Sequence, residues 1–332
     1  MTIKELAQEL NISTTTVSRV LTGQEKKYRI SSKTALRVRD GARKHQFAPN
    51  QIARNLRLQE TNTIGLIIPD ISNPFFANLA RTVEIELRKR DKMILLCDTK
   101  DKTSLEKESL HLLLGRKVDG LLVAPVGKKC DHFIKNSKIP IVLIDRYFKD
   151  QAIPFVTTDN YQGAYSATKF LIQKGHQNIA CIQGLWHTSV NENRILGYRQ
   201  AMEDHTIPDK FIQISGSGYS IQNGYESTQE LLRKRNRPTA IFALNNQIAL
   251  GAMKAIKEAG LHIPEDISLI AFDEQPYFEL LSPALTAIQQ PMQDIGKVAV
   301  ETLFKLMSGE TAENRMLKPN FIERESVKSI HL

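Results

Sequence analysis

The chain has 332 residues, 41% of them hydrophobic, so it is long enough for two or three domains with real cores and is not a disordered polyelectrolyte. Three widely spaced cysteines exclude a disulfide scaffold and a cysteine-based zinc finger, and the lack of a signal-like or membrane-length apolar run predicts a cytoplasmic protein. Of the net charge of +9, residues 1–60 contribute most, with 12 Lys and Arg against 5 Asp and Glu, which indicates either a polyanion-binding module or a solvated basic face.

Residues 1–48 are predicted to form three short helices. Thr2 with Glu5 three residues later forms a capping box, residues 11–13 break the first helix, and Gly23 ends the second. Apolar residues recur at helical spacing: Ile3, Leu6, Ala7 and Leu10, then Val17, Val20 and Leu21, then Ala35, Val38 and Ala42. Two short helices joined by a tight turn and supported by a third are typical of a helix-turn-helix.

The outward face of the second helix has an unusual composition, namely Thr14, Thr15, Thr16, Ser18 and Arg19. Threonine is a poor helix former because β-branching restricts its side chain. Short hydroxyls suit phosphates, base edges and thymine methyls, and Arg suits guanine. The face therefore predicts DNA contact, the alternative being an ordinary capped surface helix.

Residues 2–22 resemble the DNA-binding headpiece of the LacI/GalR family of bacterial transcription regulators, and the segment 14–21 closely matches that family's recognition helix. The resemblance implies that Thr14, Thr15 and Arg19 read bases in the major groove. The loop from Gly23 to Arg29 is about three residues longer than the commonest family loop and resembles that of the fructose- and sucrose-type repressors. We include Tyr28, in this loop, among the expected DNA contacts.

Residues 49–61 are expected to form a linker. The segment 50–57 follows Pro49 and could form a basic helix too short to be stable alone in water. The resemblance implies a hinge helix that orders on DNA when two copies meet, with Leu56 wedged between base steps in the minor groove. Asn50, Ala53 and Arg57 would lie alongside it, whereas a simple charged linker is the alternative.

Residues 62–332 are predicted to alternate between buried strands and helices. The strands lie at 64–68, 93–97, 119–123 and 141–144, and, in a second set that begins near Phe155, at 179–182, 240–243 and 267–272. Thr103 with Glu106 predicts a capping box for the helix that ends near Gly115. Continuous apolar strands separated by helices favour parallel sheets covered on both faces, and the repetition favours two doubly wound subdomains with a cleft between them.

This body resembles the periplasmic-binding-protein-like core of the same family. The whole chain is thus expected to be an all-α helix-turn-helix headpiece followed by an α/β core of two doubly wound parallel-sheet subdomains. The resemblance places one subdomain at about 62–160 and 291–319 and the other at about 161–289 and 320–332. It implies that the chain crosses between them near 159–161, 288–291 and 319–322.

Candidate ligand residues follow the predicted strands. Asn73 can cap a helix that starts with Pro74, and Asp145-Arg146 could be a surface ion pair. The resemblance places one of Phe75 and Phe76, together with Asp145, Arg194, Tyr219, Asn245, Asp273 and, more weakly, Gln290, around the ligand. The residues at 158–160 match a crossing segment and are expected to be structural. Convergent polar groups at strand ends predict a ligand cleft.

Enzyme motifs are absent, since the sequence has no phosphate-binding loop, no dinucleotide fingerprint, no His-Glu-x-x-His and no nucleophile elbow. We therefore expect a non-enzyme without cofactor or metal: a repressor of carbohydrate-use genes that binds a pseudo-palindromic operator as a homodimer and responds to a sugar. Alternatives are a regulator that responds to a nucleobase, a phosphorylated metabolite or a protein corepressor, and, remotely, a sugar-binding transport protein. Residues 320–332 have no apolar heptads, so no coiled-coil tetramerisation tail is expected.

Overall fold

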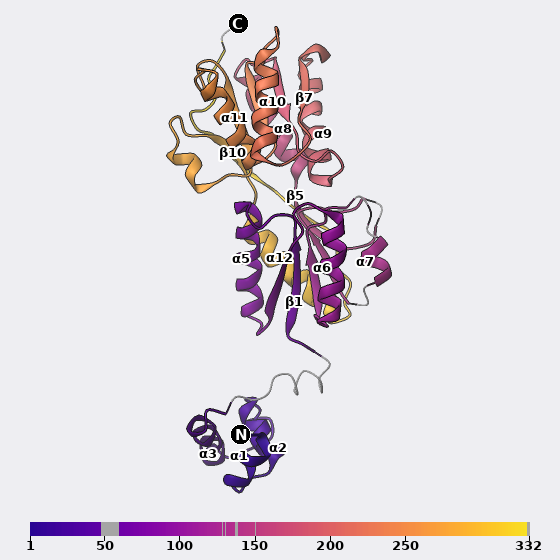
Figure 1. Ribbon diagram of the computed structural model, residues 1–332, viewed down its shortest axis with the longest axis vertical. Helices are drawn as coiled ribbons and strands as arrows, with labels where there is room; N and C mark the ends of the chain where they lie inside the picture. Colours follow the sequence, from indigo (N-terminus) through magenta and orange to yellow (C-terminus); the bar gives the residue numbers. More distant parts are fainter. Residues whose placement is uncertain (48–59, 128, 130, 137–138, 150, 331–332) are drawn as a thin grey trace. The chain divides into compact units, whose positions relative to one another are not determined.

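The computed structural model describes residues 1–47, 60–127, 129, 131–136, 139–149 and 151–330, and it divides into two compact units, Met1–Thr61 and Asn62–Leu332 (Figure 1). The first unit contains the headpiece, by which we mean residues 1–47. The second unit contains two α/β subdomains. Each unit is described by itself.

The headpiece consists of α1 (Ile3–Glu9), α2 (Thr14–Leu21) and α3 (Ser32–Lys44). The predicted capping box is present, because Thr2 Oγ1 accepts from the backbone N–H of Glu5 and the Glu5 carboxylate accepts from the backbone N–H of Thr2. Ser13 caps α2 and Ser31 caps α3, where each serine side chain accepts one hydrogen bond from the backbone N–H three residues later. The apolar stripes meet in a small core made of Leu6, Ala7, Val17, Val20, Ala35, Val38 and Ala42.

The first subdomain is built on a sheet that has, among the described residues, six strands in the order β11-β5-β4-β3-β1-β2, all paired in parallel. The strands are β1 (Thr63–Ile68), β2 (Met93–Asp98), β3 (Gly120–Val123), β4 (Ile141–Ile144), β5 (Phe155–Thr158) and β11 (Arg315–Leu317). Its helices are α5 (Pro74–Arg88), α6 (Thr103–Gly115), α7 (Asp131–Asn136) and α12 (Met292–Met307). Figure 1 shows α5 and α12 on one face of the sheet and α6 and α7 on the other.

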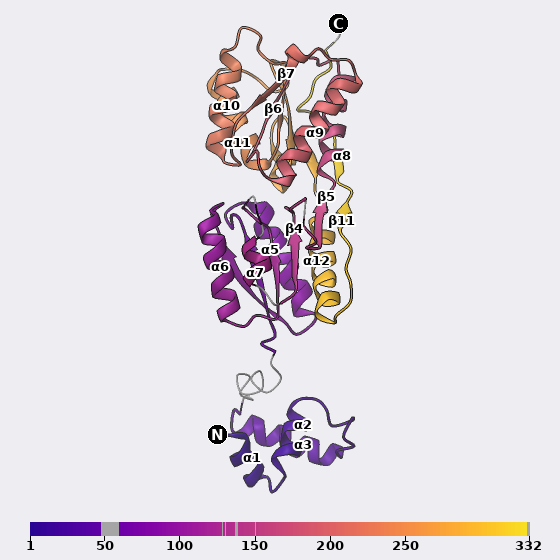
Figure 2. The ribbon, with the colours of Figure 1, turned by 90° about the vertical axis from the view of Figure 1, so that its right-hand side faces the viewer.

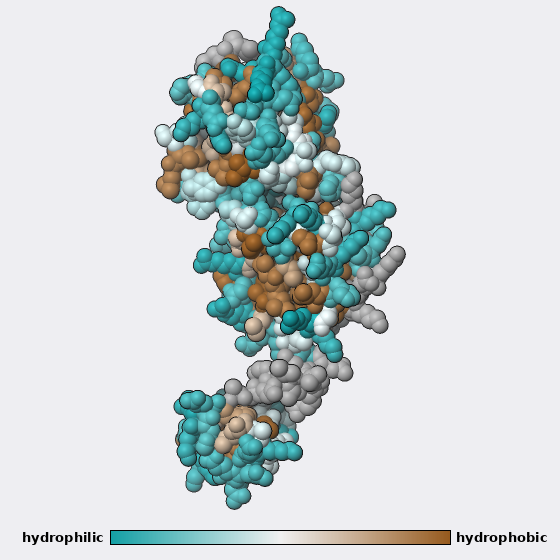
Figure 3. Space-filling model, viewed as in Figure 1, coloured by the Kyte–Doolittle hydropathy of each residue, from teal (hydrophilic) through white to brown (hydrophobic). Residues whose placement is uncertain are grey.

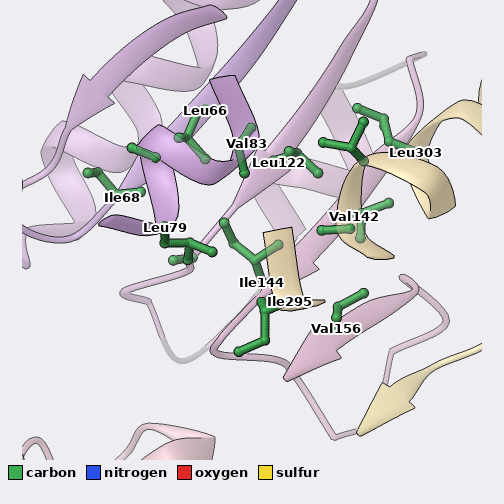
Figure 4. Close-up of a cluster of buried hydrophobic side chains, with 14 of the residues drawn as sticks. Leu66, Ile68, Leu79, Val83, Leu122, Val142, Ile144, Val156, Ile295 and Leu303 are labelled. Carbon is green, nitrogen blue, oxygen red and sulfur yellow. The ribbon is translucent and has the colours of Figure 1, made fainter. Parts of the chain in front are cut away.

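Side chains of the sheet alternate between these two helical layers. Leu66 and Ile68 pack against α5 and α12, whereas Ile67 packs against α6 and α7. The first of these clusters is shown in Figure 4, where Leu79 and Val83 of α5 lie with the strand residues. Leu79 and Val83, together with Leu87, have no exposed surface and belong to the core rather than to an outer face.

The second subdomain repeats this plan. In the part of the chain that the structure covers, its sheet has six strands in the order β12-β10-β9-β8-β6-β7, and only β12 is antiparallel. The strands are β6 (Ile179–Ile182), β7 (Ile212–Ser215), β8 (Ala240–Ala243), β9 (Ser268–Phe272), β10 (Thr286–Gln289) and β12 (Asn320–Ile322). Helices α8 (Asn160–Gln173) and α9 (Ser189–Asp204) cover one face, and α10 (Ile221–Arg233) and α11 (Asn246–Glu258) cover the other.

The chain passes between the subdomains three times, as Figure 2 shows near β5 and β11. It leaves the first sheet between β5 and α8, returns between β10 and α12, and leaves again between β11 and β12. The two strand orders therefore correspond position by position, so that β1 is equivalent to β6, β4 to β9 and β5 to β10. Two short 3-10 helices, Asp209–Phe211 and Pro276–Leu280, lie in the second subdomain.

Two local expectations are wrong. The strand at Phe155 belongs to the first sheet, where it pairs with β4, so the second set begins only with β6. Glu106 does not form a capping box, because the helix begins at Thr103 and the cap residue Lys102 makes no side-chain cap bond. Glu106 is instead fully buried, and its carboxylate accepts from the backbone N–H of Val126.

Candidate functional site

A cavity of about 260 Å³ lies at the carboxyl ends of strands from both sheets. This is the place where open parallel sheets bind ligands. Its volume is slightly below the usual range for small-molecule sites, roughly 300–1,000 Å³, and suits one small ligand. The lining residues are Asp70, Asn73, Phe75, Phe76, Asp101, Asp145, Arg146, Leu185, Val190, Arg194, Gly218, Tyr219, Ser220, Asn245, Gln247, Asp273 and Gln290. All nine ligand residues proposed from the sequence are among them.

The first subdomain contributes an aromatic wall. Asn73 caps α5, since its Oδ1 accepts from the backbone N–H of Phe75 at 3.0 Å, and Pro74 occupies the first helical position. This cap holds the rings of Phe75 and Phe76 at the cavity, edge to face with centroids 5.0 Å apart. Both rings line the cavity, rather than one of them, and both also belong to the core of the first subdomain.

Asp145 and Asp273 occupy equivalent positions in the two subdomains, directly after β4 and β9. Both have positive φ, 62° and 70°, a conformation that Asp and Asn adopt more readily than other side-chain-bearing residues. Both side chains are nearly buried, and both line the cavity. The repeated fold thus brings one carboxylate to the ligand from each side.

The electrostatics of Asp145 are dominated by burial. Burial raises the pKa of its carboxyl to about 6, although the guanidinium groups of Arg146 and Arg194 lower it. Arg146 Nε lies 3.8 Å from Asp145 Oδ2, and Arg146 Nη1 donates to Asp101 Oδ1 at 2.8 Å. The alternative of a surface ion pair at 145–146 is excluded, since only 5% of the surface of either side chain is exposed.

Arg194 is the most extensively bonded residue of the cavity wall. Its Nε donates to Asn160 Oδ1 at 2.8 Å, its Nη2 donates to Asp273 Oδ1 at 3.4 Å, and its Nη1 donates to the carbonyl of Leu244. The guanidinium carbon also lies 3.5 Å from the centre of the Phe272 ring. Because the side chain is 1% exposed, it is a structural centre of the second subdomain as well as a cavity residue.

Two further residues close the second-subdomain side. Tyr219 projects from the segment after β7, and its hydroxyl lies 3.0 Å from Thr188 Oγ1. Gly184 makes room for this ring, because a Cβ there would lie 2.1 Å from the ring. Asn245 caps α11 through a bond from the backbone N–H of Ile248 to its Oδ1, and its amide donates to the Tyr219 carbonyl at 3.2 Å.

Gln290 lies where the chain returns from β10 to α12. Its amide N–H donates to Asp273 Oδ1 at 2.6 Å, and its Oε1 accepts from Thr158 Oγ1, a residue at the end of β5. Gln290, in one crossing segment, therefore connects Thr158, in another, to the carboxylate of Asp273 in the cavity wall. Thr158 and Asn160 hold other cavity residues, which agrees with the structural role expected for that segment.

Hydrogen bonds also connect the two subdomains across the cleft. Asn246 Nδ2 donates to Asn73 Oδ1 at 3.1 Å, and the backbone N–H of Tyr147 donates to Ser189 Oγ at 2.9 Å. His187 Nε2 lies 3.3 Å from the carbonyl of Val126. A change in the angle between the subdomains must break these bonds.

Sequence reasoning missed Asp70, Asp101, Leu185, Val190, Gly218, Ser220 and Gln247, and it considered Arg146 only as the partner of Asp145 in an ion pair. The rule that ligands bind beyond the carboxyl ends of strands would have found Asp70 after β1, Asp101 after β2 and Leu185 after β6. It would not have paired Arg146 with Asp101, because the two residues are 45 positions apart in sequence.

The headpiece presents the proposed DNA-binding face on α2. Thr14 and Thr15 are exposed, whereas Thr16, Ser18 and Arg19 are half-buried. The Thr16 hydroxyl lies 2.8 Å from Ser13 Oγ, so it is shared with the helix cap. Tyr28 is exposed and lies against Arg19. The hinge residues Asn50, Ala53, Leu56 and Arg57 lie outside the described residues.

Among the described residues, no helix is long and apolar enough to cross a membrane. Within the same ranges, no three His, Cys, Asp or Glu side chains gather as metal ligands would.

Comparisons with known proteins agree with this arrangement. Residues 2–50 match the family described as bacterial regulatory proteins of the lacI family, and residues 168–327 match a periplasmic binding protein-like domain. Catabolite control protein A of Priestia megaterium is 34% identical over 333 residues, 99% of each chain. A LacI family transcriptional regulator of Enterococcus faecium with bound ribose has a TM-score of 0.74 and 32% identity over 81% of this chain and 100% of that one. The lac repressor dimer bound to operator has a TM-score of 0.87 and 23% identity over 99% of both chains.

Proposed function

Because the chain belongs to the lacI family of bacterial regulatory proteins, we propose that it represses carbohydrate-use genes and that a neutral monosaccharide in the cavity sets its affinity for the operator. It is a DNA-binding transcription regulator whose binding is modulated by a small ligand.

The charge balance of the cavity carries the choice of ligand. Among its lining residues are four aspartates and two arginines, and each guanidinium already faces an aspartate, Arg146 with Asp101 and Arg194 with Asp273. Carboxylates accept hydrogen bonds from hydroxyl groups, and aromatic walls suit the apolar faces of a sugar ring. The ribose bound to the Enterococcus faecium relative is a ligand of this kind.

A phosphorylated ligand fits this balance poorly. A phosphate brings a charge of about −1.5 to −2 at pH 7 and needs cations that are free to pair with it. Here it would compete with Asp101 and Asp273 for the two arginines. A nucleobase would stack on Phe75, Phe76 or Tyr219, which all line the cavity, and direct competition with a sugar distinguishes the two ligands.

The ligand would act by bridging the subdomains. Asn73, Phe75 and Asp145 come from the first subdomain, and Arg194 and Asp273 come from the second. A sugar bound to both sets favours the closed arrangement by the difference between its affinities for the closed and open states. That shift would be transmitted to the paired hinge segments and so to DNA.

On DNA, α2 would lie in the major groove. Thr14, Thr15, Thr16, Ser18 and Arg19 form the face that would contact it, and the hinge segment with Leu56 would enter the minor groove. A wedge at Leu56 kinks the duplex, so operator choice would include deformability as well as direct base contacts.

An apolar face on the first subdomain supports a homodimer. β2 is an edge strand, and Met93, with 71% of its surface exposed, lies on it. Figure 3 shows apolar side chains gathered on this face between α5 and α6. Its exposed members are Ile85, Met93, Leu95, Leu96 and Leu112. Pairing two copies here would bury an edge that otherwise invites association and would match a pseudo-palindromic operator.

The protein would work in the cytoplasm at the nucleoid, and it would catalyse no reaction and need no cofactor or metal, as is usual for a regulator that acts through two binding equilibria. The runner-up ligands stay distinguishable by direct competition in one binding assay.

The test is operator binding by fluorescence anisotropy at fixed salt, with DNA from upstream of the chain's own gene and its neighbours. Ribose and other neutral monosaccharides, their phosphates, and nucleobases are titrated into the complex. We expect tight binding that only a neutral monosaccharide changes. Asp145→Asn should shift the response to about 10- to 100-fold higher sugar concentration. Asp209→Asn, a change of an exposed aspartate in the second subdomain, should leave it unchanged.

Two results would overturn parts of the proposal separately. A response to sugar phosphates or nucleobases alone would refute the ligand class and leave the regulator intact. Weak binding that is steeply salt-dependent and equal for all sequences would mean that the headpiece is merely basic.

A further inference from the structure

The long loop between α2 and α3 is folded rather than open. Gly23, with φ of 70°, ends α2, and the backbone N–H of Gln24 then donates to the carbonyl of Arg19 at 2.8 Å. Within the loop, the N–H of Tyr28 donates to Gln24 and that of Ile30 donates to Glu25, at 3.1 and 2.9 Å. The extra residues therefore form a helical turn attached to the end of α2.

Two side chains fix this turn to the rest of the headpiece. Ile30 packs against the headpiece core. The Glu25 carboxylate forms an ion pair with Arg39 of α3, and hydrogen bonds to a backbone N–H and to Arg39 hold the pKa of Glu25 below its usual range. Tyr28, between these two anchors, is held in place by the loop.

The ring of Tyr28 lies against the guanidinium of Arg19, whose central carbon is 3.7 Å from the ring centre. Arg19 belongs to the last turn of α2, on the face proposed to read DNA. Arginine stacks through the flat face of its guanidinium, whereas its five N–H donors point outward in the plane. A stacked Arg19 therefore keeps its donors available for O6 and N7 of a guanine.

From this geometry we propose that Tyr28 is a positioning residue that sets base specificity through Arg19. The inference rests on the proposed DNA-binding function and deepens it. The ring limits the rotamers of Arg19 before DNA arrives, so less conformational entropy is lost when the guanidinium meets a guanine. This role accounts for the length of the loop, because the extra residues place the Tyr28 ring beside the last turn of α2.

The alternative is that the Tyr28 hydroxyl contacts a phosphate directly. The two roles differ in which part of the side chain matters. Positioning needs the ring and not the hydroxyl, and it depends on Arg19. A phosphate contact needs the hydroxyl, is independent of Arg19 and affects all DNA sequences alike.

The test compares Tyr28→Ala, Tyr28→Phe, Arg19→Ala and the double variant Arg19→Ala/Tyr28→Ala in the full-length protein. Each is titrated with the selected operator and with a set in which every base pair is replaced in turn. Cation–π contacts at exposed sites correspond to roughly two- to fivefold in an equilibrium constant. We therefore expect Tyr28→Ala to weaken binding by about that factor for each headpiece engaged and to relax preference at the base pair that Arg19→Ala also relaxes.

Tyr28→Phe should retain wild-type affinity and preference, and Tyr28→Ala should have no further effect when Arg19 is already Ala. Additive effects, or loss of binding in Tyr28→Phe, would refute positioning and favour a phosphate contact. Circular dichroism of each variant separates misfolding from altered recognition. If the wild type itself lacks operator preference, the proposed function fails; if Arg19→Ala relaxes one base pair and Tyr28→Ala does not, only this inference fails.

Discussion

Replacing Asp145 by Asn is expected to stabilise the ligand-free protein above pH 6 and to leave its stability unchanged near pH 4. Asn has nearly the same shape and adopts positive φ as readily, so the backbone at φ 62° is retained. The amide, however, carries no charge to be buried. The variant therefore isolates the free energy of holding a carboxylate in the cavity wall.

The size of the effect follows from the pKa. Burial raises the pKa of Asp145 from 3.8 to about 6, a shift of about two units at about 1.4 kcal/mol each, or about 3 kcal/mol. Well below pH 4 the carboxyl is protonated in both the folded and the unfolded state. Between pH 4 and 6 the folded state keeps a proton that the unfolded state releases, so wild-type stability falls as the pH rises, and above pH 6 the penalty is constant.

Thermal unfolding followed by circular dichroism from pH 4 to 8 measures this penalty. The Tm of Asp145→Asn should equal that of the wild type near pH 4 and exceed it by about 5–10 °C at pH 7. The exposed control Asp209→Asn should show no such divergence. The stabilised variant should also bind its sugar about 10- to 100-fold more weakly, because a hydrogen bond to a charged acceptor contributes about 1.5–3 kcal/mol.

The reasoning is refuted if the difference in Tm between the two proteins is constant from pH 4 to 8. A variant less stable than the wild type at pH 7 would refute it too, since that result would mean that attraction to Arg146 and Arg194 outweighs the cost of burial.

Three other substitutions test the architecture. Arg194→Ala should lower the free energy of unfolding by about 3–5 kcal/mol as well as removing the ligand response, because it leaves Asp273 buried without its cation, and adding Asp273→Asn should restore part of that stability in denaturant titrations. Gly251→Ala should destabilise the protein by about 1–3 kcal/mol, since its Cβ would lie 2.0 Å from a backbone oxygen of α10, whereas Gly115→Ala has open space around it and should not. Equal melting temperatures of the two variants would contradict the close packing of α10 on α11. Leu96→Asp should convert dimers to monomers in analytical ultracentrifugation and weaken operator binding, and an unchanged sedimentation coefficient would place the dimer interface elsewhere.

Many of the helices and strands can be predicted from patterns among residues that are close together in the sequence. The helical spacing of apolar residues within each of the three helices, such as those around Leu6, Val17 and Val38, predicts the headpiece core. The continuous apolar runs predict parallel strands buried on both faces. Caps behave in the same way, because the bond from the Glu5 backbone N–H to Thr2 Oγ1 joins residues only three positions apart in the chain. Such features depend on the periodicity of apolar residues and on hydrogen bonds between residues close together in the chain, and both can be recognised in the sequence alone.

The cavity residues could be predicted from the sequence for a related reason. Asp145, Asn245 and Asp273 each follow an apolar strand, and parallel strands bring their carboxyl ends to one edge. Family resemblance then selected among the polar residues at those edges. What neither source supplied is which partners these groups have, and hence that Arg146 is buried against Asp101 and that Arg194 supports Asn160 and Leu244.

The sequence by itself therefore determined the kinds of element, their order and the residues that end each strand. Only the tertiary structure decided that the strand at Phe155 completes the first sheet, that the apolar strand β2 lies at an exposed edge, and that Glu106 points inward. The physical reason is that burial and charge pairing depend on distances between residues far apart in the chain. The stack of Tyr28 on Arg19 shows the same dependence even within the short headpiece.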